Sequence, residues 1–176
     1  MLPFSLLVHS NHVMNELSHF DEQGASRMVD VTQKAVTERM ARAEGFVLMH
    51  PKTLRTIRQK EISKGDVLEV ARLAGIMATK HTDTLIPLCH SLGLDSARIE
   101  FSFPDDGRLK IESEVRVCAR TGIEMEALTA VSITALTIYD MCKAIDRAME
   151  IQDIRLTEKQ GGRSGHYLRQ PSADLT

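Results

Sequence analysis

Residues 97–117, ARIEFSFPDDGRLKIESEVRV, carry the clearest structural pattern in the sequence. On each side of the segment Pro104–Gly107, apolar residues alternate with polar ones, as they do in strands with one buried face. The segment itself, Pro-Asp-Asp-Gly, has the composition of a tight turn. This stretch therefore predicts a β-hairpin, with strands over about 97–103 and 109–117.

The residues before the hairpin predict one strand and two helices. Residues 36–49 alternate imperfectly and favour a strand, and the proline that follows suits the first turn of a short helix over about 51–60. After Asp66, apolar residues recur at helical spacing, and Asp66 is placed to cap the helix in an acidic variant of the capping box. We expect this second helix over 66–80.

A long helix and a last strand are expected after the hairpin. Residues 124–149 show helical periodicity, and the middle of this segment, 127–139, is apolar or small on every side. Such a helix needs cover beyond its own sheet, and we expect a subunit partner to supply it. Residues 154–156 predict a short strand. The order βαββαβ is that of an α+β, ferredoxin-like fold, an antiparallel sheet with helices packed on one face.

Composition and charge exclude several classes of protein. The 176 residues fit a single domain, and a formal net charge of −2 argues against general nucleic-acid binding. The longest uncharged apolar stretch falls well short of the ~20 residues that span a bilayer. The three cysteines form no CxxC pair, and the N-terminus lacks the basic start of a signal peptide. We expect a cytoplasmic protein with reduced thiols and no membrane segment.

The apolar segment LIPLCH at 85–90 ends in a candidate functional histidine. From this segment alone, a core histidine that donates to a backbone carbonyl is an equally good interpretation. Cys89 and His90 are adjacent, which is awkward spacing for two ligands of one zinc ion, so we expect no metal site.

Charged residues at helix ends and in loops are further candidates, each with a simpler alternative. Glu124 and Glu126 suit the positive end of the helix dipole, although they point in different directions and are unlike a proton-sharing pair. Lys64 precedes a glycine and a helix start, where it could hold an anion or simply be a solvated loop lysine. Arg163, in a glycine-rich segment, could bind phosphate or belong to a tail.

Asp140 and Lys143 lie three residues apart and therefore share one face of the long helix. They stand at the end of the apolar run, where we expect burial. Because a buried ion pair is a weak stabilising device, a polar functional site is the better explanation.

Taken together, five segments resemble, in order and spacing, the cyclic pyranopterin monophosphate synthases of molybdenum cofactor biosynthesis. The segments are MVDV at 28–31, KGDV at 64–67, LIPLCH at 85–90, TGIEMEAL at 121–128 and LTIYDMCK at 136–143. The resemblance covers about residues 17–167. It implies a ferredoxin-like homohexamer, a trimer of dimers, with active sites at a subunit interface.

The family resemblance also implies a reaction. The substrate would be a cyclised dihydroguanosine triphosphate, which is converted to cyclic pyranopterin monophosphate with release of pyrophosphate. No resident cofactor is implied, and a need for Mg²⁺ with the triphosphate stays open. By domain, we expect a mobile arm over 1–26 with Met14 as a candidate start, a single catalytic domain over 27–160, and a glycine-rich loop and tail over 161–176.

The resemblance assigns roles to individual residues. Asp140, Lys143 and Lys64 would be catalytic. The positions that would bind substrate are Leu88, Cys89, His90, Met125, Glu126, Glu124, Arg27 and Arg163. The sequence departs from the family pattern at Arg163, where a lysine is usual, and at Thr82-Asp83-Thr84, near the rim of the site. An arginine keeps the charge but does not readily donate a proton.

The main alternative from another class is a ferredoxin-like binding module for RNA or a small regulatory ligand. RNA modules of this fold stack bases on sheet aromatics. Phe101 and Phe103 share one alternating face, but the chain has no basic aromatic motif. A purely structural role in an assembly is a further alternative.

Overall fold

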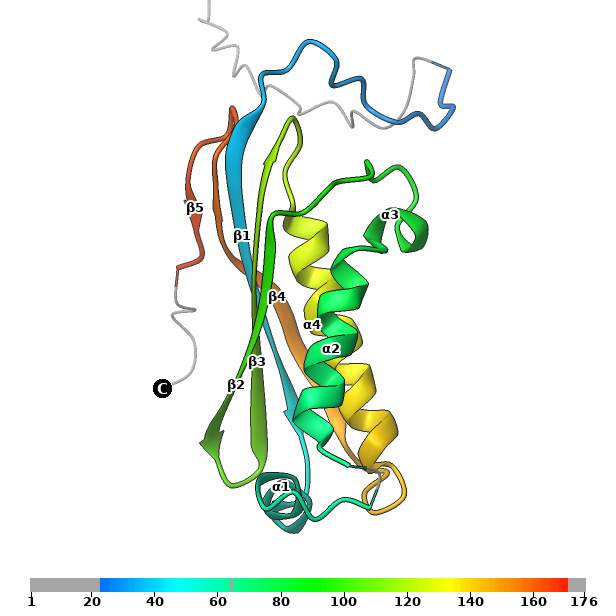
Figure 1. Ribbon diagram of the computed structural model, residues 1–176, viewed down its shortest axis with the longest axis vertical. Helices are drawn as coiled ribbons and strands as arrows, with labels where there is room; N and C mark the ends of the chain where they lie inside the picture. The colour runs from blue at the N-terminus through cyan, green and yellow to red at the C-terminus, as the bar shows by residue number, and fades with distance from the viewer. Residues whose placement is uncertain (1–22, 64, 171–176) are drawn as a thin grey trace, which may run out of the picture.

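The structure is a computed structural model that describes residues 23–63 and 65–170 (Figure 1). Its elements along the chain are β1 Thr37–Leu48, α1 Pro51–Arg58, α2 Val67–Thr79, α3 Thr82–Leu85, β2 Ser96–Asp105, β3 Arg108–Ala119, α4 Glu124–Cys142, β4 Glu150–Gln160 and β5 Tyr167–Leu168. Most of the predicted N-terminal arm, including Met14, and the predicted catalytic residue Lys64 lie outside the described residues.

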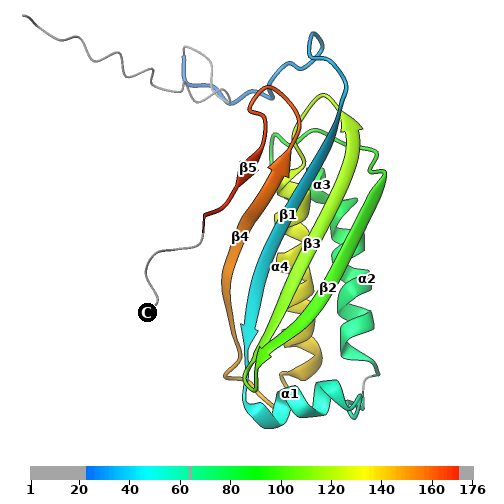
Figure 2. The same ribbon diagram turned by 90° about the vertical axis from the view of Figure 1, so that its left-hand side faces the viewer.

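The strands form one antiparallel sheet in the order β2-β3-β1-β4-β5. The helices α2 and α4 lie side by side on one face of this sheet, and α1 lies across one end of it (Figures 1 and 2). This arrangement confirms the α+β, ferredoxin-like prediction. Within the described parts of the chain, no helix is long and apolar enough to cross a membrane.

The hairpin that anchored the prediction is present as β2 and β3. The apolar members of the β3 alternation, among them Leu109, Ile111 and Val115, are buried beneath the helices. The turn is tied by the carboxylate of Asp105, which accepts a hydrogen bond of 2.9 Å from the backbone N–H of Gly107. The period-two pattern therefore marks the buried face of the sheet correctly.

The chain after the hairpin differs from the prediction in where elements end. The long helix stops at Cys142 rather than near residue 149. Beyond it, Asp146 accepts hydrogen bonds from the N–H of His50 at 2.9 Å and from the hydroxyl of Thr53 at 3.1 Å, which fixes a turn against α1. The last strand is longer than predicted, because β4 spans 150–160. Its charged side chains include Arg155, which pairs with Glu44 at 2.7 Å on the sheet surface.

Two short elements were not predicted at all. The helix α3 has four residues and β5 has two. The strand β5 pairs with β4 through Tyr167 and Leu168, so regular structure extends into the segment expected to be a loop and tail.

The apolar middle of α4 packs against the sheet and against α2. At the crossing of the two helices, a Cβ on Gly75 of α2 would collide with the hydroxyl of Thr134 and lie 3.2 Å from the carbonyl oxygen of Ala130. The absence of a side chain at Gly75 is therefore what allows the two helices to approach so closely.

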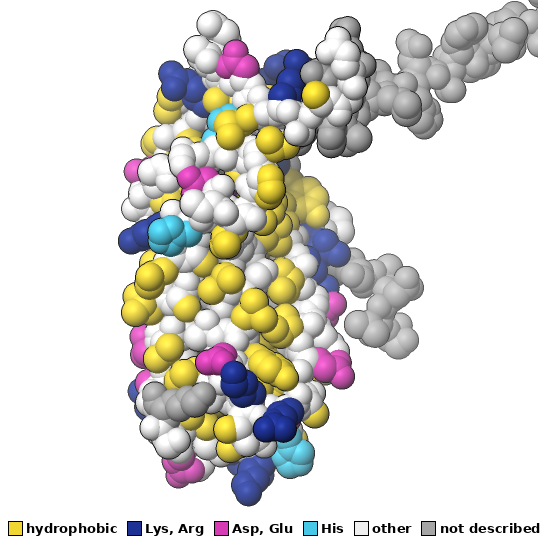
Figure 3. Space-filling view, turned by 90° about the vertical axis from the view of Figure 1, so that its right-hand side faces the viewer, with side chains coloured by type: hydrophobic (Ala, Val, Ile, Leu, Met, Phe, Trp, Pro, Cys, Tyr) yellow, Lys and Arg dark blue, Asp and Glu magenta, His cyan; other side chains and the backbone are white. Residues whose placement is uncertain are grey.

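The outer surface of the helix layer carries apolar side chains that the chain itself leaves exposed (Figure 3). On α2 and α4 these are Val70, Leu73, Met77 and Leu136. The expectation that a subunit partner covers this layer stays a prediction.

We expect Gly75→Leu to lower the free energy of unfolding by about 2 kcal/mol, because the new side chain has no room between α2 and α4. Urea denaturation followed by circular dichroism measures this change. The control Glu69→Leu adds the same side chain at an exposed position of α2, where we expect a change within about 0.5 kcal/mol. Equal effects in the two variants would contradict the proposed close contact.

Candidate active site

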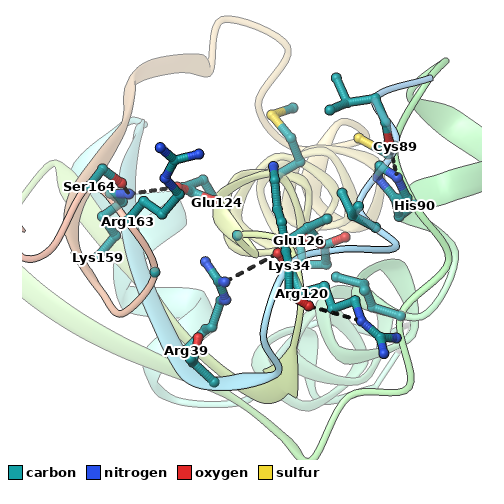
Figure 4. A pocket seen from close by; sticks show the side chains of 18 of the residues that line it. Lys34, Arg39, Cys89, His90, Arg120, Glu124, Glu126, Lys159, Arg163 and Ser164 are labelled. Atoms are coloured by element: carbon teal, nitrogen blue, oxygen red, sulfur yellow. Dashed lines mark hydrogen bonds and ion pairs between the residues drawn. The ribbon is translucent and has the colours of Figure 1, made fainter. Parts of the chain in front are cut away.

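A cleft of about 790 Å³ opens at the end of the molecule where α4 begins. Five separate segments line it: the approach to β1, the loop after α3, the end of β3, the first turn of α4 and the glycine-rich loop after β4 (Figure 4). Seven of the eight predicted substrate-binding residues face this cleft within one chain. They are Leu88, Cys89, His90, Glu124, Met125, Glu126 and Arg163.

The loop after α3 presents Cys89 and His90 to the cleft. Leu88 adopts a left-handed backbone conformation with φ of 69°, which costs a non-glycine residue on the order of 1 kcal/mol. The Nε2 atom of His90 lies 2.8 Å from the carbonyl oxygen of Val29. Because a carbonyl only accepts, Nε2 carries a hydrogen. The histidine thus satisfies the backbone contact expected of a core residue and also lines the cleft.

Glu126 is the one strongly perturbed carboxyl group among the described residues. Its side chain is buried, with a residue exposure of 4%. Burial, followed by the negative charges of Glu124 and Asp83, raises the pKa of Glu126 to about 7. A group with a pKa near neutrality can both give and take a proton under cellular conditions, which suits general acid–base catalysis.

Cys89 remains a thiol in this environment. Burial raises its pKa, and the negative charges of Glu126 and Asp83 raise it further. Because the thiolate is the nucleophilic form, Cys89 is poorly suited to covalent catalysis and better suited to contact a bound molecule.

Several basic side chains line the cleft. Arg39 donates from Nε to the carbonyl of Ala119 at 3.1 Å and from Nη2 to the carbonyl of Arg120 at 3.2 Å. Arg120 in turn donates to the carbonyl of Lys34 at 3.1 Å. Within the described part of the chain, no ion pair joins either guanidinium to a carboxylate. Their charge is held in place by neutral carbonyl groups and is available to an anion.

The glycine-rich loop closes directly over these cations. A Cβ at Gly162 would collide with the guanidinium of Arg39, and a Cβ at Gly161 would collide with the carbonyl of Glu38. Both glycines also have positive φ, at 74° and 90°. Only glycine permits this approach, which brings Arg163 to the cleft wall.

Sequence reasoning missed Arg39, Arg120 and Lys159 as site residues. Lys159 is the penultimate residue of β4, lies 3.5 Å from Glu124, and lines the same cleft as Arg163. It therefore supplies an amine four residues before the position where the family pattern led us to expect a lysine. Arg39 and Arg120 are neighbours only because β1 pairs with β3, with Thr37 opposite Ala119. A basic residue immediately before the glycine-rich segment was the available signal for Lys159.

The predicted catalytic pair does not reach this cleft. Asp140 and Lys143 form an ion pair of 2.6 Å, but their side chains are 62% and 52% exposed. Our expectation that the pair is buried is wrong within the chain, because both side chains lie on an outer face of α4, whereas Cys142 in the same region of the helix is fully buried. Asp140 follows Glu126 by 14 residues on one helix, which corresponds to about 21 Å.

A second cavity, of about 580 Å³, lies at this other end of α4. It is lined by the end of α4 and by Glu61, Ile62 and Ser63, the residues just before Lys64. Arg27, by contrast, is exposed and does not line the large cleft. In the described segments, no cluster of three His, Cys, Asp or Glu side chains could hold a metal ion.

Comparison with known proteins gives one consistent family. A model of the MoaC family matches residues 28–162. A "Cyclic pyranopterin monophosphate synthase" of Magnetococcus marinus is 61% identical over 158 residues, which are 89% of this chain and 96% of that protein. A protein of the same name from Desulfitobacterium hafniense is 57% identical over 155 residues, 88% of this chain and 95% of that protein. "Cyclic pyranopterin monophosphate synthase 3" of Mycobacterium bovis is 61% identical over 153 residues, covering 87% and 86%.

The raised pKa of Glu126 predicts a pH-dependent stability. In the folded state this pKa is about 7, above the ordinary value of 4.5. The group therefore favours folding below the ordinary value, and that contribution is lost as the pH rises through 7. Relative to the wild type, Glu126→Gln should gain stability between about pH 5 and pH 8, by as much as ~3 kcal/mol.

Urea denaturation of both proteins at the two pH values checks this expectation. The matched control is Glu61→Gln at an exposed position, whose difference from the wild type should not change with pH. A difference between Glu126→Gln and the wild type that is also constant with pH would show that the carboxyl is ionised normally.

Proposed function

This chain belongs to the MoaC family, and on that premise we propose how it works as a cyclic pyranopterin monophosphate synthase of molybdenum cofactor biosynthesis. The proposed substrate is the cyclised dihydroguanosine triphosphate, and the products are cyclic pyranopterin monophosphate and pyrophosphate. One observation carries the proposal: a single cleft joins a carboxyl group that titrates near neutrality, Glu126, to fixed guanidinium groups without carboxylate partners. The reaction needs both, since protons move on the ring while a charged phosphate group leaves.

The cationic wall would bind the triphosphate. The guanidinium of Arg39 is oriented by two carbonyl groups before any ligand arrives, so it loses little freedom on binding phosphate oxygens. Arg120, Lys159 and Arg163 add positive charge around it. When a ribose hydroxyl closes onto the α-phosphate, these groups stabilise the charge that develops on the departing pyrophosphate. We propose no resident cofactor, and any Mg²⁺ would enter with the triphosphate.

The opposite wall would hold the guanine-derived ring. Leu88 and Met125 offer apolar contact, while Cys89 and His90 offer a neutral thiol and an imidazole. Glu126 lies at the base of this wall and, with its pKa near 7, can accept a proton from one ring atom and return it to another. Glu124, which lies 3.5 Å from Lys159, links the two walls.

We propose that Asp140, Lys143 and Lys64 complete the site from a second copy of the chain. The rigid length of α4 keeps Asp140 and Lys143 away from the cleft of their own subunit, yet leaves them exposed to a neighbour. The apolar surface of α2 and α4 gives such a neighbour a place to pack. In this proposal the enzyme is a cytosolic homohexamer, a trimer of dimers, with each active site at a subunit interface.

The RNA-binding alternative depended on sheet aromatic rings that are open to stack bases, and the structure does not leave these rings open. Phe101 and Phe103 are half-buried and pack against the core. The guanidinium of Arg72 lies 5.0 Å from the ring centre of Phe101, and that of Arg58 lies 5.0 Å from the ring centre of Phe103. Rings covered in this way offer no open platform for bases.

We expect Asp140→Asn, Lys143→Ala and Lys64→Ala each to lower kcat by about 100-fold or more, because each removes a proton-transfer group. The measurement is pyrophosphate release and pterin formation from freshly made cyclised substrate. The control Asp106→Asn makes the same change as Asp140→Asn in the β2–β3 turn, and it should keep wild-type turnover. Absence of turnover by the folded wild type would refute the synthase proposal. Active variants would refute only these residue roles.

A site shared between subunits also predicts complementation. Glu126→Gln and Lys143→Ala homo-oligomers should each be nearly inactive, but mixed oligomers made by co-refolding should regain about a quarter of the wild-type sites. In such a mixture, some interfaces pair an intact cleft with an intact Lys143. Turnover of the mixed sample, compared with the two variants alone, measures this recovery. If each site lies within one chain, mixing restores nothing.

A further inference from the structure

The loop that carries Cys89 and His90 is fastened to α3 at both of its ends. At its start, the N–H of Ile86 donates to the carbonyl of Thr82 at 2.9 Å. At its end, the hydroxyl of Ser91 donates to the carboxylate of Asp83. These two attachments close the loop around its apolar middle.

The helix α3 is itself well anchored, so it can serve as a base for the loop. Thr82 is buried, and its hydroxyl donates to the carbonyl of Ala78, at 3.2 Å, in the last turn of α2. Between the two attachments, Leu88 is held in its left-handed conformation. Strain of this kind persists only where surrounding contacts fix the backbone, and the Asp83–Ser91 hydrogen bond is one of these contacts.

A small polar cavity of about 260 Å³ lies behind the loop. Asp83 and Ser91 line it, and so do His90 and Glu126. Because His90 and Glu126 also border the large cleft, Asp83 lies behind these two residues as seen from that cleft.

The negative charge of Asp83 affects two titratable groups, one on the loop and one on α4. Burial is the largest cause that raises the pKa values of Cys89 and Glu126, and the negative charge of Asp83 adds to it in both cases. Other charged or titratable groups face these two groups from every side. They are Glu124 on α4, Lys80 after α2, His90 on the loop, Arg39 on β1, Arg120 after β3, Lys159 on β4, Arg163 in the glycine-rich loop and Lys34 before β1.

We propose that Asp83 is a positioning residue of this site, which holds the substrate loop through Ser91 and sets the electrostatic environment of Cys89 and Glu126 from behind. The inference rests on the proposed function for its catalytic meaning. Asp83 does not line the large cleft. It lies in the Thr82-Asp83-Thr84 segment, where this chain departs from the family pattern.

Two substitutions separate the two effects of Asp83. Asp83→Asn keeps an oxygen that can accept from Ser91 but removes the charge. Ser91→Ala removes the hydrogen bond but keeps the charge. Ser91→Thr restores a hydroxyl and should restore the function of the loop. Asp106→Asn, at the far end of the sheet, is the matched control for the loss of a carboxylate.

The first measurement needs no turnover. In a Cys118→Ser background, which removes the exposed thiol, the rate of alkylation of Cys89 by iodoacetamide is followed against pH by mass spectrometry; Cys142 is buried. Loss of the Asp83 charge should move the midpoint to lower pH by ~0.3 to 1 unit, so that alkylation at about pH 8 is roughly 2- to 10-fold faster. Ser91→Ala should leave the midpoint in place.

The second measurement is steady-state turnover. Ser91→Ala should raise KM by about 3- to 10-fold with a smaller change in kcat, because a loosened loop binds substrate less well. Asp83→Asn should shift the pH profile of kcat/KM toward acid with little change in KM. An unchanged thiol midpoint in Asp83→Asn overturns the proposal, and so does an unchanged KM in Ser91→Ala. If the wild type fails to turn over, the proposed function fails, while the thiol measurement still decides the role of Asp83.

Discussion

The length of α4 is the constraint on which the rest of the molecule depends. Its 19 residues form a rod of about 28 Å that is packed along the sheet and against α2. The first turn of this rod carries Glu124 and Glu126, and its last turn carries Asp140. A packed helix does not bend to bring its ends together, so one chain presents two sets of polar groups at opposite ends. In the function proposed above, these two sets are the two halves of one active site, and symmetry between copies would be the simplest way to join them.

Within the large cleft, a carboxyl group with a raised pKa lies among several cations. Lys159 and Arg163 lie to one side, while Cys89 and His90 lie to the other (Figure 4). Glu126 is close enough to Glu124 and Asp83 to feel their negative charge, and burial denies it the stabilisation that water would give its ionised form. A cleft with many cations can therefore still keep a carboxyl group partly protonated.

The sequence alone was enough to predict the elements whose apolar residues recur regularly along their whole length. The alternation around Ile99 and Ile111 and the helical spacing after Asp66 identified the hairpin and α2, because burial on one face leaves a regular trace. The end of α4 was misplaced because the residues after Cys142 still contain apolar side chains, while the contacts of Asp146 that fix the turn come from distant α1. Four-residue α3 and two-residue β5 are too short to show a period.

Site residues that are neighbours in the sequence could be predicted, whereas those that only the fold brings together could not. Residues 88–90 and 124–126 are contiguous motifs, and the structure places all of them in one cleft. Arg39 and Arg120 are 81 residues apart and meet only through the pairing of β1 with β3. No periodicity encodes such a meeting, because it depends on strand order and register. The exposure of Asp140 and Lys143 was equally hard to predict, since it depends on which face of α4 the neighbouring elements cover.

The left-handed conformation of Leu88 has a consequence for protein engineering. A glycine there would adopt the same conformation without strain, and an uncharged residue at position 126 would avoid the burial of a carboxyl group, so a thermostabilisation campaign guided by folding energy alone would select changes at both positions. Both positions border the cleft. Variants of this enzyme chosen for heat resistance should therefore be designed with residues 88 and 126 held constant, and with stabilising changes directed to the sheet surface far from the loop.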